Sequence, residues 1–432
     1  MVLVSRKIYF YSIILWLICL YPCKSIAINY YWVGGTGSWS DINHWATTSG
    51  GTINHLQVPT AFDDVIFDTS SFSATNQTVT VNSANPVCRD MNWTGARFTP
   101  KFTGLNTLRV YGSLKLIPAM NWNYTGQIYF ESTSPGRTIT SAGKIFYSIT
   151  FQGIGGEWTL MDALNITVSS NLISGSLITN NQNVNCQSFY CTSSNARSLI
   201  LGSSIITVGS IYSTSSRLYL IGDNLSLDPG TSIFKVLGKN TSLNQPRNIV
   251  SILGSSALSL HNIEITNTNP YCVSNVDLTC EIQSKTTFHK MTISGKQFYL
   301  SYYSSTNAKI IIDSLLIMGD CSKTFDNSYK LKINEIICSQ NAELFLNVDQ
   351  QDTIKNLLFN GYQCTINGIN AKFHKAILNR DSYINGSNTF DSLTFAPGYR
   401  YELSSASTQT INTKFSAEGA CSGNSNYSPP VF

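Results

Sequence analysis

The chain has 432 residues with 28 Lys and Arg against 24 Asp and Glu, so only 12% of its side chains are charged. Soluble domains average about 25%, and no basic stripe or Lys/Arg run is present, which argues against nucleic acids and acidic membranes as electrostatic partners. Apolar residues make up 42% and aromatic residues 12%, enough for a buried core and too many for wholesale disorder.

The first segment predicts a secretory signal peptide over residues 1–27. Arg6 and Lys7 precede an apolar run over 8–20, and a small-residue cleavage site ends at Ala27. A membrane-spanning helix needs about 20 apolar residues, and neither this run nor a later one reaches that length. We therefore expect a mature chain that is secreted or held at the cell surface, without membrane insertion.

Residues 28–100 are expected to form an amino-terminal capping module and the first coils of a repeat. They begin with the Trp/Gly-rich run YYWVGGTGSWSDINHWA (30–46). Trp32, Trp39 and Trp45 could form an aromatic platform for sugar rings. They could instead close the end of a repeat stack, where an uncovered strand would be an aggregation-prone edge. We favour the cap, because terminal repeats are expected to be atypical.

Three carboxylates follow in the run DDVIFD (63–68). Asp63, Asp64 and Asp68 are weak candidates for calcium ligands, since calcium prefers several carboxylate and carbonyl oxygens. In an alternating strand Asp64 and Asp68 share one face while Asp63 points away. We therefore favour a solvated strand end, and we expect no cofactor.

The most informative pattern is a recurring hexad, apolar-x-x-apolar-x-apolar, whose starts lie 17 to 28 residues apart and about 22 on average. Its residues do not share one helix face, so it fits a strand in which the polar pair turns a corner. Sparser early copies occur at 88–93, 146–151 and 186–191. The main copies lie at 260–265, 288–293, 312–317, 333–338, 354–359, 373–378 and 390–395.

Further short alternating runs lie between the hexads, as at 344–348 and 399–403. Two or three short strands per repeat of about 21 residues, without a helix, describe one coil of a β-solenoid. The sequence thus predicts an all-β, parallel β-helix-like solenoid over residues 101–420, with coils about 4.8 Å apart. A β-sandwich array is the alternative, but nothing recurs at its spacing of roughly 100 residues.

Both ends of the chain carry specific motifs: WVGGTGSWSDINHWA (32–46) and DDVIFD (63–68), then NTFDSLTFAPG (388–398), TQTI (408–411) and GACS (419–422). These motifs resemble those of large secreted and cell-surface repeat proteins of the Bacteroidetes. The resemblance implies export by a type IX secretion system of gliding bacteria, display outside the outer membrane and an adhesin-like role. Such proteins continue beyond the last motif with more coils and a sorting domain, so residues 421–432 are expected to be a short tail of a truncated chain.

Nine cysteines remain after removal of the signal peptide. Export makes disulfides possible, and the close pairs Cys186/Cys191 and Cys272/Cys280 are the best candidates. The alternative is that these cysteines are small buried hydrophobic residues. No Cys-x-x-Cys motif and no His/Cys ligand spacing occurs, so a structural zinc site is not expected.

Candidate catalytic residues are sparse. The outward pairs of the hexads stack no carboxylates, whereas polysaccharide-cleaving β-helices need several charges on one face. His289 and His374 each precede a Lys at the same coil position and are expected to be surface corner residues. The Tyr302-Tyr303 pair is the exposed aromatic candidate in the middle of the rod.

We therefore expect a non-enzymatic, adhesin-like solenoid that contacts glycan or other cell-surface components through polar and aromatic groups. The alternative is a polysaccharide lyase or hydrolase of the β-helix type, and a third option is a structural spacer without a ligand. An acidic cluster beside an Arg or Lys would favour the enzyme. A flat surface of Thr, Ser, Asn and Tyr would favour adhesion.

Overall fold

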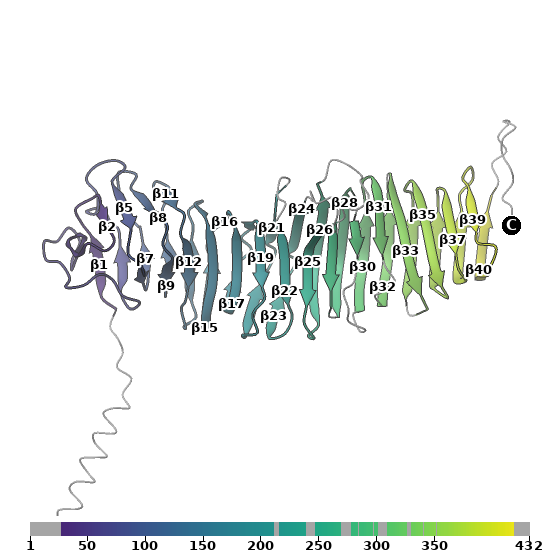
Figure 1. Ribbon diagram of the computed structural model, residues 1–432, viewed down its shortest axis with the longest axis horizontal. Helices are drawn as coiled ribbons and strands as arrows, with labels where there is room; N and C mark the ends of the chain where they lie inside the picture. Colours follow the sequence, from purple (N-terminus) through teal and green to yellow (C-terminus); the bar gives the residue numbers. More distant parts are fainter. Residues whose placement is uncertain are drawn as a thin grey trace, which may run out of the picture.

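In a computed structural model the chain forms a long rod of stacked β-strand coils (Figure 1). The structure describes residues 27–210, 216–238, 247–268, 278–283, 285–296, 298–300, 309–325, 330–339, 341–350 and 352–418. It is 59% strand with about 21 residues per coil, which confirms the predicted β-solenoid. No helix within these ranges is long and apolar enough to span a membrane. The predicted signal peptide, apart from Ala27, and the predicted tail lie outside the described residues.

The strands form three sheets that follow the rod. The long sheet contains 23 of the described strands: β1 (Asn29–Trp32), β3 (Trp45–Ala46), β4 (Asp64–Ile66), β6 (Val87–Cys88), β7 (Met91–Asn92), β9 (Leu108–Val110), β10 (Leu114–Lys115), β12 (Gln127–Phe130), β13 (Arg137–Thr140), β15 (Ser148–Leu160), β17 (Ser169–Ile178), β19 (Ser188–Cys191), β20 (Arg197–Ile200), β22 (Arg217–Ile221), β23 (Leu225–Asp228), β25 (Arg247–Leu253), β27 (Leu278–Ile282), β29 (Phe298–Leu300), β31 (Cys321–Phe325), β33 (Ala342–Asp349), β35 (Gln363–Ile369), β37 (Ser382–Asn385) and β39 (Tyr401–Leu403).

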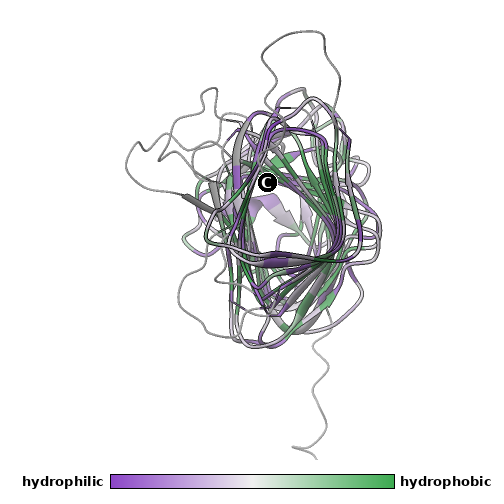
Figure 2. Ribbon diagram, turned by 90° about the vertical axis from the view of Figure 1, so that its right-hand side faces the viewer, coloured by the Kyte–Doolittle hydropathy of each residue, from purple (hydrophilic) through white to green (hydrophobic). Residues whose placement is uncertain are grey.

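A short sheet near the amino-terminal end contains β2 (Gly37–Ser38), β5 (Thr78–Val81), β8 (Lys101–Gly104) and β11 (Asn121–Tyr124). The third sheet, which we call the hexad sheet, contains β14 (Ile145–Phe146), β16 (Leu164–Ile166), β18 (Val184–Cys186), β21 (Ile205–Val208), β24 (Ile233–Gly238), β26 (Leu258–Asn267), β28 (Thr286–Gly295), β30 (Lys309–Ile317), β32 (Lys330–Cys338), β34 (Thr353–Phe359), β36 (Lys372–Leu378), β38 (Asn388–Phe395) and β40 (Gln409–Ala417). Viewed along the rod, successive coils superpose in one outline (Figure 2).

The seven main hexads form the strands β26 to β38 of the hexad sheet. In β28 the apolar residues Phe288, Met291 and Ile293 are buried, while His289 and Lys290 are exposed. The pairing of β26 with β28 passes from Phe288 directly to Lys290 and omits the residue between them. The second residue of each hexad thus bends the strand outward, which confirms the expected corner and lets all three apolar residues face the core.

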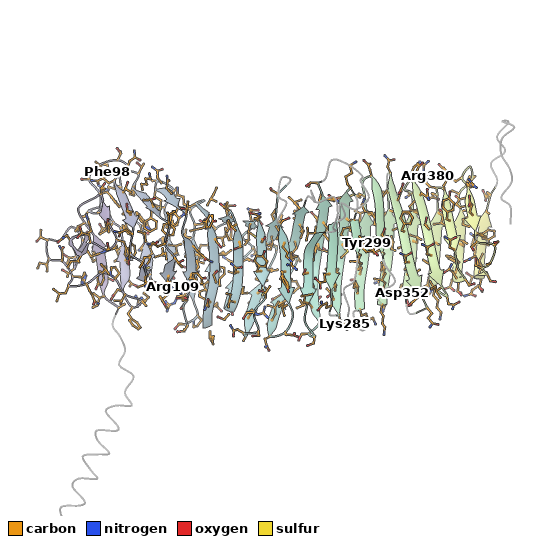
Figure 3. The ribbon with its side chains drawn as sticks, viewed as in Figure 1. Phe98, Arg109, Lys285, Tyr299, Asp352 and Arg380 are labelled. Carbon is orange, nitrogen blue, oxygen red and sulfur yellow. The ribbon has the colours of Figure 1, made fainter. Side chains whose placement is uncertain are left out.

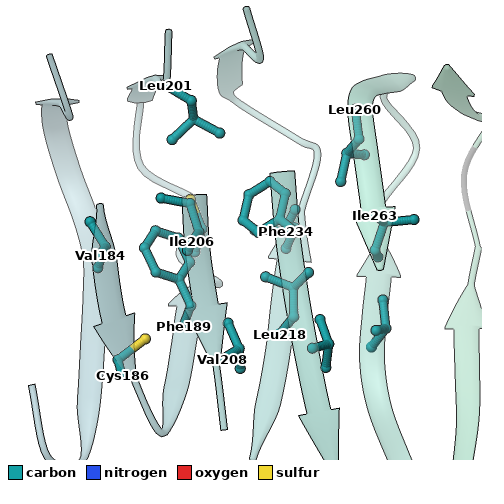
Figure 4. Close-up of a cluster of buried hydrophobic side chains, with 14 of the residues drawn as sticks. Val184, Cys186, Phe189, Leu201, Ile206, Val208, Leu218, Phe234, Leu260 and Ile263 are labelled. Atoms are coloured by element: carbon teal, nitrogen blue, oxygen red, sulfur yellow. The ribbon is translucent and has the colours of Figure 1, made fainter. Parts of the chain in front are cut away.

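The core is a continuous column of apolar side chains, because each coil covers the inward face of its neighbour. Figure 4 shows a section in which Val184, Phe189, Ile206 and Leu218 from successive coils are fully buried. A single coil cannot bury its own inward face, so each coil depends on its neighbours in the stack for stability.

The first coil is covered by a strand of opposite direction. β1 pairs in parallel with β4 on one side, and β3 pairs with it antiparallel on the other, with Trp32 opposite Trp45. β3 therefore occupies the hydrogen-bonding edge of β1 that would otherwise be open, as a cap should.

Candidate functional site

The three tryptophans of the amino-terminal module lie inside the cap. Trp32, Trp39 and Trp45 are each 0% exposed, and the Trp45 ring contacts both others edge to face with centroids 4.9 Å apart. The indole nitrogens of Trp32 and Trp45 donate to backbone carbonyls at 2.7 and 2.8 Å. This geometry leaves no indole face for a sugar ring, so the structure contradicts the sugar-platform hypothesis for these residues.

Two glycines of the motif allow this close packing. Gly35 has φ +72°, a left-handed conformation that favours glycine. A Cβ on Gly37 would lie 1.9 Å from Nε2 of His44, whose ring stacks on Trp32 with centroids 4.6 Å apart. The spacing of Gly and Trp in the motif is therefore explained by packing within the cap.

The three calcium candidates are each engaged by the protein itself. Asp63 is buried, and its carboxylate accepts hydrogen bonds from the backbone and hydroxyl of Thr60 at 2.8 and 2.6 Å. Asp64 forms an ion pair with Arg89, and Asp68 accepts a hydrogen bond from the backbone of a turn. Within the described ranges no three acidic, histidine or cysteine side chains are placed to hold a metal. The three aspartates are turn and ion-pair residues, which corrects both the calcium and the solvated-end interpretations.

The cysteine candidates are buried thiols. Cys186 and Cys191 are free, which corrects the predicted disulfide: Cys186 lies in the hexad sheet and Cys191 in the long sheet. Burial raises the pKa of these thiols to about 12 and about 11. Cys280 is also a buried free thiol, and Cys272 lies outside the described residues.

Tyr302 and Tyr303 lie outside the described residues, whereas both candidate histidines lie on the expected corner. Nδ1 of His374 is 2.6 Å from a carboxylate oxygen of Asp391 in the next coil, and His289 faces Asp313 in the same way at 3.4 Å. An asparagine from the following coil donates to each of these aspartates at 2.9 Å. The corner is thus a polar ladder of His, Asp and Asn between coils.

The two histidines of this ladder are exposed, and its aspartates accept hydrogen bonds from the asparagines of the following coils. The Asn412 amide and the His374 ring hold the pKa of Asp391 below its usual value. Both aspartates therefore act as acceptors for neighbouring coils, which supports a stacking role for the corner.

The strongest candidate surface lies on the long sheet, where outward residues of successive strands form two columns, which we call the two halves of the stripe. The first column continues from Ser251 to Glu281 of β27, and the second begins at Tyr299, which pairs with Thr279 two residues away on the same strand. The amino-terminal half contains Arg109, Tyr129, Thr150, Asn171, Tyr190, Tyr219 and Ser251. The carboxyl-terminal half contains Tyr299, Thr324, Phe345, Thr365, Tyr383 and Glu402. Figure 3 labels Arg109 and Tyr299 at two points along the rod.

Along the stripe, aromatic side chains are interspersed with small side chains that carry hydroxyl groups. The aromatic side chains are partly exposed, whereas Thr150, Ser251 and Thr365 between them are buried. The guanidinium of Arg109 lies over the Tyr129 ring, 4.9 Å from its centroid. The surface is therefore built of flat side chains, hydroxyls and amides, with few formal charges.

A second ladder runs beside the carboxyl-terminal half of the stripe. Asn367 donates to the side-chain oxygen of Asn347, and Asn385 donates to that of Asn367, both at 2.8 Å. These asparagines lie two residues along the same strands from Phe345, Thr365 and Tyr383. A ring-bearing column and an amide-bearing column are therefore adjacent on one face.

A search of protein-family models, of curated proteins and of solved structures finds no match to this chain.

Proposed function

We propose that this protein is a secreted or surface-displayed, non-enzymatic β-solenoid that binds glycan along its stripe, in an adhesin-like role. The supporting observation is the column of partly exposed rings, hydroxyls and amides on the long sheet. Aromatic side chains offer large, rigid contact faces, while amides and hydroxyls can exchange hydrogen bonds with sugar hydroxyls. Export and surface display follow from the signal-like first segment and from the resemblance to Bacteroidetes repeat proteins.

The test is a glycan array probed with purified residues 28–432, followed by Tyr219→Ala and Tyr383→Ala variants, one in each half of the stripe. Truncating a ring that stacks on a sugar should weaken binding about 2- to 10-fold per ring, from roughly 0.5–1.5 kcal/mol for an aromatic contact. Tyr147→Ala is the matched control, because Tyr147 is an exposed tyrosine outside the stripe. Unchanged binding in both stripe variants would contradict the proposed surface.

A polysaccharide-cleaving enzyme is the competing proposal, and a reducing-end assay on each bound polysaccharide distinguishes the two. Release of reducing ends by the wild-type chain would overturn the non-enzymatic proposal. Absence of binding to every glycan on the array would instead favour a structural spacer.

A further inference from the structure

The carboxyl-terminal half of the stripe has a regular two-coil period. Tyr299, Phe345 and Tyr383 occupy every second strand of the long sheet, and Thr324 and Thr365 occupy the strands between them. Strands in a sheet lie about 4.8 Å apart, so successive rings are about 9.6 Å apart along the rod. The amino-terminal half lacks this regularity, since Tyr190 and Tyr219 lie on adjacent strands.

We propose that this half of the stripe binds an extended, neutral β-1,4-linked polysaccharide whose axis runs along the rod, with every second sugar on an aromatic side chain. The inference rests on the proposed glycan-binding function and names the ligand class. In an extended β-1,4-linked chain successive sugars are flipped, so the same ring face recurs after two sugars. That repeat closely matches the length of two coils. A helical α-1,4-linked chain curves away from a straight column.

The asparagine ladder fits the edge of such a chain. Asn347, Asn367 and Asn385 follow the same coils as Phe345, Thr365 and Tyr383, and each amide has hydrogen-bonding capacity beyond the contact it makes within the ladder. Amide groups repeated at every coil can pair with hydroxyls repeated at every sugar. The ladder thus supplies hydrogen bonds in register with the rings.

Charge favours a neutral ligand. Among the described strands β27 to β39 of the long sheet, the outward charged side chains are Glu281, Glu343, Asp349 and Glu402. The only cationic residue in these strands, Lys323, lies in the inward column and is buried. These described strands therefore present no outward cation that would attract uronic acid or sulfated chains.

The test is calorimetric titration of residues 28–432 with β-1,4-linked gluco- and manno-oligosaccharides of two to six sugars, with maltohexaose as the α-1,4-linked comparison. Affinity should rise about 2- to 10-fold when the chain grows from two to three sugars, and again from four to five. These steps are expected because the third and fifth sugars reach the second and third rings. Maltohexaose should bind more weakly than both β-linked hexasaccharides.

Phe345→Ala makes the test specific for the two-coil period. Removing the central ring leaves Tyr299 and Tyr383 four coils apart, so the gain at three sugars should disappear while a gain at five sugars remains. Phe345→Tyr should keep both steps, and Tyr362→Ala, at a 65% exposed tyrosine outside the stripe, should leave them unchanged. Circular dichroism confirms that each variant is folded.

Each failure has a separate meaning. Binding that prefers maltohexaose, or that lacks steps with chain length, would overturn the inference while glycan binding itself stands. Binding steps that survive in Phe345→Ala would likewise overturn the assigned register. If neither these oligosaccharides nor any glycan of the array binds, the proposed function fails as well.

Discussion

Lys323 is the most unusual residue of the core. It occupies the inward column between Phe298 and Leu344, and its side chain is fully buried. Its ammonium donates to the backbone oxygens of Asp320 at 2.8 Å and Gly295 at 3.1 Å. Burial lowers the pKa of Lys323 to about 8, although nearby Cys338 and Asp320 act in the opposite direction. The rod thus holds a lysine whose charge is disfavoured by its surroundings.

Comparison with a Lys323→Met variant should show that burying the charged lysine makes the free energy of unfolding depend on pH. Unfolded lysine has a pKa near 10.4, so between about pH 8 and 10.5 the unfolded chain binds more protons than the folded one. The stability of the wild type should therefore rise with pH relative to the variant, by about 3 kcal/mol in total. Urea unfolding of both proteins from pH 7 to 10.5, under reducing conditions, measures the difference. A pH-independent difference would contradict the buried, proton-releasing lysine.

The thiols of Cys186 and Cys191 should behave as core atoms. Because both are buried and their pKa values are raised, a thiol reagent at pH 7.5 should not modify them in the folded protein. Alkylation after unfolding without reductant, followed by mass spectrometry, should show both residues modified. If the two cysteines were found linked to each other in that experiment, the disulfide would exist and the assignment of free thiols would be wrong.

At the scale of elements, the cap strand β3 closes the amino-terminal end of the stack. It is the described strand that pairs antiparallel, while the coils pair in parallel. The ring of Trp45, which belongs to β3, packs against the rings of Trp32, Trp39 and Phe67. The cap therefore combines a satisfied backbone edge with an aromatic plug over the first coil.

Deletion of residues 28–68 should expose the edge of the next coil and cause aggregation. Size-exclusion chromatography and light scattering at several concentrations measure this, with the full mature chain as reference. Leu56→Ser is the control within the same segment, because Leu56 is 97% exposed and its replacement leaves the cap intact. A soluble, cooperatively unfolding deletion variant would show that β3 is dispensable as a cap.

How much the sequence predicted differs between the two faces. The hexads predicted the hexad sheet because each of its strands presents three buried residues in a fixed pattern. Aligning the hexads also places His289 opposite Asp313 and His374 opposite Asp391. The stripe was missed because strands of the long sheet are short and variable in spacing, and each contributes one outward residue to the column. An alignment of these strands, anchored on the hexad that follows each of them, would have revealed the stripe in the sequence.

Other errors have equally physical causes. Closeness in sequence suggested a bond between Cys186 and Cys191, but a corner places them in different sheets. The indoles of Trp32 and Trp39 could be assigned to a cap or a platform until their burial was known. A lysine is expected outside a core, so nothing in the pattern marks Lys323 as an inward residue.

At the scale of the whole molecule, each coil contacts only its neighbours, so stability is distributed along the rod rather than held in one centre. The last described strand, β40, differs from the interior strands. Its inward positions Ile411 and Phe415 are partly or largely exposed, whereas the equivalent Phe390 and Leu393 of β38 are buried. Local opening should therefore begin at this strand.

Hydrogen exchange measured by mass spectrometry should show protection that falls from β34 to β40. Amides of β40 are expected to exchange first, because their strand loses the fewest contacts on opening. Strands such as β28 and β30 in the interior of the stack should exchange last. Uniform exchange along the rod would contradict independent opening and indicate a single cooperative unit.

The antiparallel cap gives the rod a direction of assembly. Because β3 blocks one edge of β1, a new coil can be added only on the side of β4. The cap and its first coils come earliest in the chain, so a finished template exists before the later coils emerge. Each following segment of about 21 residues then needs to find only the most recent strand. A rod of this length can therefore fold as a zipper closing from one end, without a search among distant pairings.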